Sequence, residues 1–210
     1  MARRKNKISK PKKNTFAIIV DGKTEVWYFQ MLKRNEPHLQ VNIDPQIPQK
    51  KELSGQYKKV LEFAQDYINV FWIIDLDKII KESREAKPGN KTKIQELKVY
   101  LQELDKKGYN NVVTIFNNPC LEYWFLLHYE QTTRYFHKCS SAEKQLKKHL
   151  PDYEKTRKFF TKQNQDIYLR LKSNLKTAIL NAQRVQRNDL DNLEKAICEM
   201  NLFFNVIKNL

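Results

Sequence analysis

Glycine, cysteine and long apolar segments are scarce in this chain of 210 residues. Four glycines and seven prolines exclude collagen-like and low-complexity sequences. The three cysteines, Cys120, Cys139 and Cys198, are widely spaced and form no Cys-Xaa-Xaa-Cys pair, which argues against a disulfide framework and against a cysteine-built zinc site. The longest apolar runs, such as residues 16–20 and 121–127, are too short to span a bilayer. Neither a membrane protein nor a disulfide-stabilised secreted domain is therefore expected.

The chain also lacks a secretory signal pattern, because Met1 is followed by basic and polar residues. Hydrophobic residues make up 40% of the chain and aromatic residues 11%. This is enough for a buried core, so global disorder is excluded. We therefore expect a cytoplasmic protein without a membrane partner.

Positive charge is in excess, with 39 Lys and Arg against 24 Asp and Glu and a formal net charge of +15. Residues 1–14 contain seven of these cations, including Arg3, Arg4 and Lys5, and no acid. This segment is predicted to be a basic flexible tail. The remaining residues are basic too, which favours contact with nucleic-acid phosphates, although solubility alone is an alternative explanation.

Apolar runs at three places are typical of strands buried on both faces, and a fourth segment alternates as a half-exposed strand does. The buried runs are residues 16–20, 70–74 and 111–116, and the alternating segment is 39–43. Helical periodicity predicts helices over residues 23–34, 54–67, 91–106, 119–129, 141–149, 154–187 and 189–210, with a polar loop over 80–90. Alternating strands and helices predict an α/β core with a mostly parallel sheet flanked by helices over residues 15–135. Residues 136–210 are predicted to be a helical extension without further strands.

Two of the buried strands end in carboxylates. Asp21 follows the first strand, with Glu25 one turn into the next helix, and Asp75 and Asp77 follow the strand over 70–74. Residues two apart on an extended segment point the same way, and ligand sites of parallel sheets lie at the carboxyl ends of the strands. If the two strands are neighbours, Asp21, Asp75 and Asp77 converge, and clustered carboxylates suit Mg²⁺ or Mn²⁺. A single Asp after a strand more commonly caps a helix or fills a turn.

Three segments resemble the RloB-like family, a branch of the Toprim superfamily. Residues 21–25 (DGKTE) with Tyr28-Phe29 are similar to its acid-Gly-Xaa-Thr-Glu…Tyr-Phe opening. Residues 118–128 (NPCLEYWFLLH) resemble its Asn-Pro-Cys…Glu…Trp…Leu-Leu-His signature. The segment 75–77 (DLD) lies where Toprim domains carry paired aspartates. The resemblance covers about residues 16–130.

The resemblance implies a Toprim-like fold that binds Mg²⁺ and acts on nucleic acid, in a family associated with bacterial defence against phage. It implies that Asp75 and Asp77 are metal ligands. The first acid of the superfamily is normally Glu, whereas this chain has the shorter Asp21, and Glu25 could supply the missing reach. We expect a metal-dependent nuclease in which Asp21 or Glu25 completes the metal shell or acts on the attacking water. The alternatives are a non-cleaving nucleic-acid-binding or sensor subunit and a module that binds a defence-system partner protein.

Three further side chains are candidates with two interpretations each. Glu122, a carboxylate in an apolar helix, is either paired with a buried cation or an additional catalytic acid. Lys23, beside the first acid, either contacts a phosphate or is a solvated turn residue. His128 lies about 240° round the helix from Glu122, so we predict a structural histidine that does not share a site with it.

Overall fold

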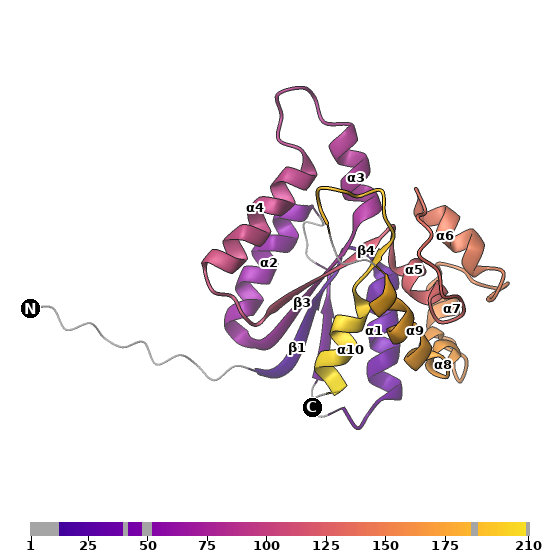
Figure 1. Ribbon diagram of the computed structural model, residues 1–210. Coiled ribbons are helices and arrows are strands. Elements are labelled where there is room, and N and C mark those ends of the chain that lie inside the picture. Colours follow the sequence, from indigo (N-terminus) through magenta and orange to yellow (C-terminus); the bar gives the residue numbers. More distant parts are fainter. Residues whose placement is uncertain (1–12, 40–41, 48–51, 186–188, 209–210) are drawn as a thin grey trace, which may run out of the picture.

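A five-stranded sheet forms the centre of the computed structural model, which describes residues 13–39, 42–47, 52–185 and 189–208 (Figure 1). The strand order is β2-β1-β3-β4-β5. The strands are β1 (Lys13–Ile19), β2 (Asn42–Gln46), β3 (Tyr67–Asp75), β4 (Val112–Asn118) and β5 (Ile197–Cys198). The first four run parallel and β5 is antiparallel to β4. The predicted α/β fold with a mostly parallel sheet flanked by helices is confirmed.

The central strands are buried on both faces, as their apolar sequences predict. Phe16 and Ile18 of β1 belong to the hydrophobic core on one face, whereas Ala17 and Ile19 belong to the core on the other. This is the alternation expected of a strand. β1 begins at Lys13, so the last two residues of the predicted tail are part of the strand. The cations at positions 3, 4 and 5 lie outside the described residues.

One face of the sheet is covered by α2 (Leu53–Asp66), α3 (Leu76–Arg84) and α4 (Lys93–Lys106). α2 and α4 agree with the predicted helices to within two residues. The prediction of a loop over residues 80–90 is wrong at its start, because α3 continues to Arg84. Leu76, Ile79 and Ile80 bury one stripe of this short helix. The helix begins directly after β3, and no glycine or proline separates the two elements.

The opposite face is covered by α1 (Lys23–Asn35), α5 (Leu121–Leu126) and α10 (Met200–Lys208), with the remaining helices packed outside them. Those helices are α6 (Cys139–Leu146), α7 (Arg157–Phe160), α8 (Ile167–Lys172) and α9 (Leu175–Arg184). α5 is shorter than the predicted helix over 119–129. Asn118 stays in β4 and donates hydrogen bonds to the carbonyls of Leu193 (2.8 Å) and Lys195 (2.7 Å) instead of capping α5. No helix in the described ranges is both long and apolar enough to cross a bilayer.

The C-terminal residues return to the sheet, which the sequence did not indicate. β5 pairs with Asn117 and Asn118 of β4, so the prediction that no strand follows residue 135 is wrong. The single helix predicted over 154–187 is replaced by the short helices α7, α8 and α9, and the one predicted over 189–210 is confirmed only for α10. Phe203 of α10 packs against Phe29 and Phe71, with ring centroids 5.0 and 4.9 Å apart. A two-residue strand has no detectable periodicity, so only its pairing with β4 reveals it.

A disulfide joins Cys120, which precedes α5, to Cys139 at the start of α6. The prediction that the cysteines form no disulfide is therefore wrong. Cys139 lies 19 positions after Cys120 in the sequence, and their approach depends on how α6 packs against α5. The third cysteine, Cys198, is free and buried in β5.

Candidate active site at the carboxyl edge of the sheet

Carboxylates gather where β1 and β3 end. The two strands are adjacent and parallel, as their convergence requires. Asp21 follows β1, and Asp75 is the last residue of β3. The negative charges of Asp21, Glu25 and Glu122 all act on Asp75. Residues from β1, α1, β3 and α5 thus place four acids at one edge of the sheet.

Glu25 lies in the first turn of α1 with only 5% of its surface exposed. Burial, and next the charge of Asp21, raise the pKa of Glu25 to about 7. The hydroxyl of Thr24 donates a hydrogen bond to Glu25 Oε2 over 3.0 Å. The preceding Gly22 makes room for this carboxylate, since a Cβ at position 22 would lie 2.1 Å from Oε2. The Asp-Gly-Xaa-Thr-Glu sequence therefore has a local structural role, because Gly22 and Thr24 accommodate the buried carboxylate of Glu25 near Asp21.

Asp75 has weak hydrogen bonds and strong electrostatic repulsion. Its oxygens accept hydrogen bonds from Asn117 Nδ2 and from the backbone N–H of Leu121, each with a donor–acceptor distance of 3.3 Å. Burial, and next the charges of Glu25 and Asp21, raise the pKa of Asp75 well above its usual range. Asn117 is completely buried, and its Oδ1 has no hydrogen-bond partner among the described residues. The side chain that contacts Asp75 therefore carries a buried oxygen acceptor without a donor among the described residues, and ionisation of Asp75 itself is unfavourable.

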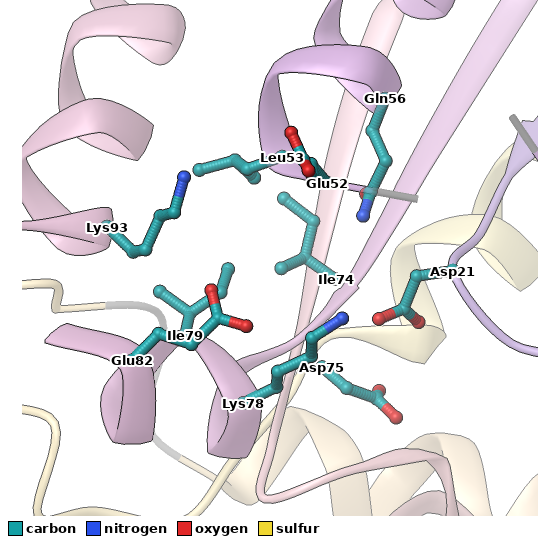
Figure 2. A pocket seen from close by; sticks show the side chains of 10 residues that line it. All are labelled: Asp21, Glu52, Leu53, Gln56, Ile74, Asp75, Lys78, Ile79, Glu82 and Lys93. Atoms are coloured by element: carbon teal, nitrogen blue, oxygen red, sulfur yellow. The ribbon is translucent and has the colours of Figure 1, made fainter. Parts of the chain in front are cut away.

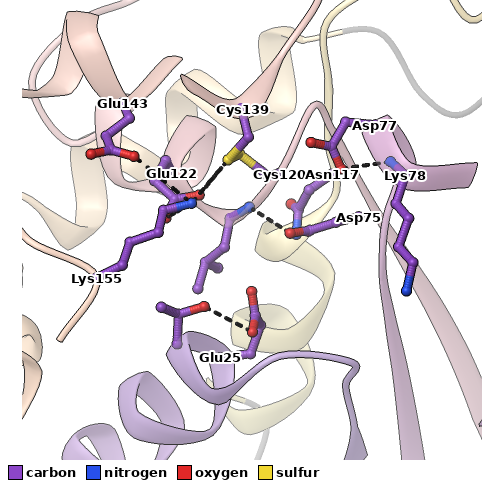
Figure 3. The surroundings of a disulfide bond; sticks show 12 residues. Glu25, Asp75, Asp77, Lys78, Asn117, Cys120, Glu122, Cys139, Glu143 and Lys155 are labelled. Atoms are coloured by element: carbon purple, nitrogen blue, oxygen red, sulfur yellow. Dashed lines mark hydrogen bonds and ion pairs between the residues drawn. A yellow bond between two sulfur atoms is a disulfide. The ribbon is translucent and has the colours of Figure 1, made fainter. Parts of the chain in front are cut away.

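Asp77 is placed differently from the prediction. It lies in the first turn of α3 and not on an extended segment with Asp75. Its N–H donates to the Pro119 carbonyl (3.2 Å), and its Oδ1 accepts from the N–H of Lys78 (2.7 Å; Figure 3). Burial raises the pKa of Asp77. The argument that two-residue spacing aligns both carboxylates fails here because the strand ends at Asp75.

Glu122 is 2% exposed and lies beside the disulfide, at the junction of α5 with the later helices (Figure 3). Tyr153 Oη donates to Glu122 Oε1 over 2.6 Å, and Lys155 Nζ lies 2.8 Å from the same oxygen. The predicted alternative of a pairing with a cation is therefore what the structure contains. Neither Tyr153 nor Lys155 was identified from the sequence, because nothing in their local pattern indicates contact with a residue about 30 positions earlier.

A pocket opens beside these acids, on the face covered by α2, α3 and α4. Figure 2 shows Asp21, Asp75 and Lys78 at one end of it. The rest of the lining comes from Glu52, Leu53, Gln56, Ile74, Ile79, Glu82 and Lys93. The pocket is lined by side chains of both charges, so an anionic group could approach the acids only with the help of cations such as Lys78 or a bound metal ion.

The other two candidates are less central. Lys23 is exposed at the start of α1, next to Asp21 in the sequence. His128 is buried, its Nδ1 lies 3.0 Å from the Trp124 carbonyl, and its Nε2 has no partner in the part of the chain that the structure describes. Burial lowers the pKa of His128 to about 4, so the ring is neutral at pH 7. These contacts agree with a structural histidine.

The acids do not all form one compact ligand group. Within the described ranges, the group of three metal-ligand side chains whose donor atoms lie within 4.8 Å of one another consists of Cys120, Glu122 and Cys139. Asp21, Asp75 and Asp77 are not in it. A cation at the ends of β1 and β3 would have to draw these carboxylates closer together or reach some of them through water.

Comparison with protein-family models matches residues 16–210 to one family, described as RloB-like protein. The match includes the helices after residue 135 as well as the sheet. Searches of curated proteins and of solved structures found no match.

Proposed function

The chain belongs to the RloB-like protein family, and from this premise we propose that it is a metal-dependent nuclease. The proposed reaction is cleavage of phosphodiester bonds in DNA or RNA with Mg²⁺ or Mn²⁺. We also propose that the fold is Toprim-like and that the protein acts in antiviral defence with a partner protein. The order of its acids, one after β1 and a pair after β3, supports the Toprim assignment.

The observation that carries the proposal is the clustering of carboxylate charges around Asp75, on which Lys155 acts without forming an ion pair. Within the described ranges, no ion pair joins Asp75 or Glu25 to a Lys or Arg, although both have raised pKa values. Several like charges held in a poorly hydrated place are stable only if they are protonated or bind a cation. The unpartnered Oδ1 of Asn117 adds a neutral oxygen ligand. Carboxylate and amide oxygens are the ligands that Mg²⁺ and Mn²⁺ prefer, so the residues fit the ion.

Each residue has a distinct role in the proposed mechanism. Asp75 would hold the ion together with Asp21 and Asp77, and the ion would supply polarisation of the scissile phosphate and neutralise charge in the transition state. Glu25, whose pKa of about 7 matches neutral conditions, accepts the proton of the attacking water. Lys23 and Lys78 are exposed at this edge and would contact the phosphate backbone. The excess of basic residues recruits the polynucleotide.

A second candidate function is a nucleic-acid-binding or sensor subunit that does not cleave. Two observations favour it. Asp21 is one methylene shorter than the Glu normally found at this place in the resembled superfamily, and the donor atoms of Asp21, Asp75 and Asp77 do not form a compact group. In this alternative the acids bind an ion that assists binding only.

The experiment that separates the two functions is cleavage of duplex DNA, single-stranded DNA, tRNA and unstructured RNA with Mg²⁺, Mn²⁺ or EDTA. The test variant is Asp75→Ala/Asp77→Ala. The chain supplies a matched control in its second Asp-Leu-Asp sequence, where Asp189 and Asp191 are exposed to solvent. The nuclease predicts metal-dependent cleavage that is lost in the test variant and kept in Asp189→Ala/Asp191→Ala. Absence of cleavage of every substrate, with salt-sensitive binding intact, would favour the sensor.

A further inference from the structure

Two cysteines and a buried glutamate form a tight cluster that the proposed nuclease mechanism does not use as a unit. Cys120, Glu122 and Cys139 each offer one ligand atom, and these atoms lie within 4.8 Å of one another (Figure 3). Two of the three precede or begin α5, and the third begins α6. The cluster therefore ties the sheet-bound segment to the first helix of the C-terminal part.

One contact in the cluster joins Glu122 directly to a sulfur of the disulfide. Glu122 Oε2 lies 2.9 Å from Cys139 Sγ. A disulfide sulfur carries no hydrogen, so this contact is not a hydrogen bond. A carboxylate oxygen and a sulfur approach each other favourably when a proton or a metal ion lies between them. Glu122 thus places a third donor atom beside the two sulfurs, where a metal ion could bind once the disulfide is reduced.

We propose that, when the disulfide is reduced, Cys120, Cys139 and Glu122 bind a divalent cation of the zinc class. Two equivalents of a thiol reductant supply the electrons: the S–S bond breaks, two protein thiols form, and the reductant becomes a disulfide. Binding of the ion then releases the two thiol protons to solvent. Thiolates are soft ligands that select zinc-class ions over Mg²⁺, so this site is chemically distinct from the acids at Asp75.

The local geometry accommodates such an ion. With Zn–S bonds of about 2.3 Å and tetrahedral angles, the two sulfurs would lie roughly 3.8 Å apart. The Cα atoms of the two cysteines are 5.6 Å apart, and rotation about the Cα–Cβ bonds can separate the sulfurs to that distance. Glu122 supplies the third ligand. Three protein ligands leave one position open to water, as in zinc sites that are not purely structural.

Lys155 competes with the ion for this place. Its Nζ lies 2.8 Å from Glu122 Oε1 and 3.2 Å from Cys139 Sγ. The ammonium group thus supplies a positive charge at the spot where the cation would bind. Its side chain is 39% exposed, so it can turn into solvent when the ion enters. Removing this charge should make the ion bind more tightly.

The test uses the full chain, reduced with a phosphine reductant that is then removed, and Zn²⁺ or Co²⁺ as the probe. We expect the reduced chain to bind one equivalent of Zn²⁺ in competition with a chromophoric chelator. With Co²⁺ it should show a thiolate-to-metal charge-transfer band. Cys120→Ser and Cys139→Ser should lose the band, and the disulfide form should lack it. Cys198→Ser is the matched control and should keep it, because Cys198 is buried in β5 and is not one of the three grouped donors. Lys155→Met should lower the dissociation constant for Zn²⁺.

Several results would overturn the proposal. The reduced chain could show no charge-transfer band with Co²⁺, or the disulfide form could bind Zn²⁺ as tightly as the reduced form. Retention of the Co²⁺ band in Cys139→Ser would be a third contradicting result. Alkylation of the folded, reduced chain provides a second readout that does not depend on a spectrum. Zn²⁺ should slow the alkylation of Cys120 and Cys139 and leave that of the buried Cys198 unchanged. Circular dichroism of each variant identifies loss of folding. The proposal does not rest on nuclease activity, so Asp75→Ala/Asp77→Ala should still bind Zn²⁺ through the cysteines.

Discussion

Glu25 and Glu122 are two buried glutamates on the same functional edge, but their surroundings differ. Glu122, on the side of the C-terminal helices, has the ammonium of Lys155 and the hydroxyl of Tyr153 within hydrogen-bonding distance. Glu25, on the side of the sheet, has the hydroxyl of Thr24 and the negative charge of Asp21 near it. The protein therefore neutralises one carboxylate with its own cation and leaves the other with a pKa of about 7.

This difference indicates where an added cation is needed. Near Glu122 the protein supplies positive charge, and a metal ion has to displace Lys155. Near Glu25 and Asp75 the carboxylates repel one another and their pKa values are raised, so protonation or a bound cation would relieve the repulsion. In the proposed function, the acids on the side of the sheet bind a hard cation, and their mutual repulsion lowers stability when no ion is bound, a compromise common at functional sites.

The largest expected effect concerns activity. Asp75→Asn removes the charge at the centre of the acids, and we expect cleavage to fall by about 10²–10³-fold, the size seen when one charge-stabilising group is lost. Glu122→Gln should reduce cleavage much less if its charge is already balanced by Lys155. Initial rates on the preferred substrate measure both, with Asp191→Asn as the exposed control. Equal losses of cleavage in Asp75→Asn and Glu122→Gln would contradict the distinction between the side of the sheet and the side of the C-terminal helices.

The second effect is on stability and its pH dependence. The pKa of Glu25 is raised in the folded state from 4.5 to about 7. Ionisation of Glu25 is therefore less favourable in the folded state than in the unfolded state. The contribution of protonated Glu25 to the free energy of unfolding is complete below about pH 4.5 and is lost as the pH rises through about 7. In EDTA at pH 8, Glu25→Gln should be more stable than the native chain by up to about 3 kcal/mol, and at pH 4.5 the difference should vanish. Urea denaturation measures it, with exposed Glu85→Gln as control.

The third effect has the opposite sign. Glu122→Gln leaves Lys155 without its buried partner, so we expect the free energy of unfolding to fall by about 1–2 kcal/mol, less than for a fully buried pair because Lys155 is partly exposed. The same denaturation experiment with Lys155→Met and the double variant completes a cycle. Additive losses would show that the two side chains do not interact.

The smallest effect tests the local design around Gly22. Gly22→Ala places a Cβ where Glu25 Oε2 lies, so the carboxylate has to move. We expect a stability change within about 1 kcal/mol, together with weaker stabilisation of the chain by Mg²⁺ in thermal unfolding. In a Glu25→Ala background the same substitution should have no effect on the Mg²⁺ response. A Mg²⁺ response that Gly22→Ala leaves unchanged would remove Glu25 from the ion-binding residues.

The sequence predicted the parts of the molecule that depend on local pattern. The apolar runs identified β1, β3 and β4 because a strand buried on both faces must be apolar along its length. The positions of Asp21 and Asp75 at the strand ends, and of Glu25 in the first turn of α1, followed from the same pattern. The boundary after β3 was misjudged, since α3 starts with buried apolar residues and moves Asp77 into a helical turn.

What the sequence determined by itself is therefore the parallel core and the places where acids leave it. Only the tertiary structure decided that β5 returns to pair with β4, that Cys139 meets Cys120, and that Lys155 neutralises Glu122. These contacts join residues that are between 19 and about 80 positions apart. No local periodicity encodes such pairs, because each depends on how whole helices pack on the sheet, which lowers the free energy through burial of a shared core.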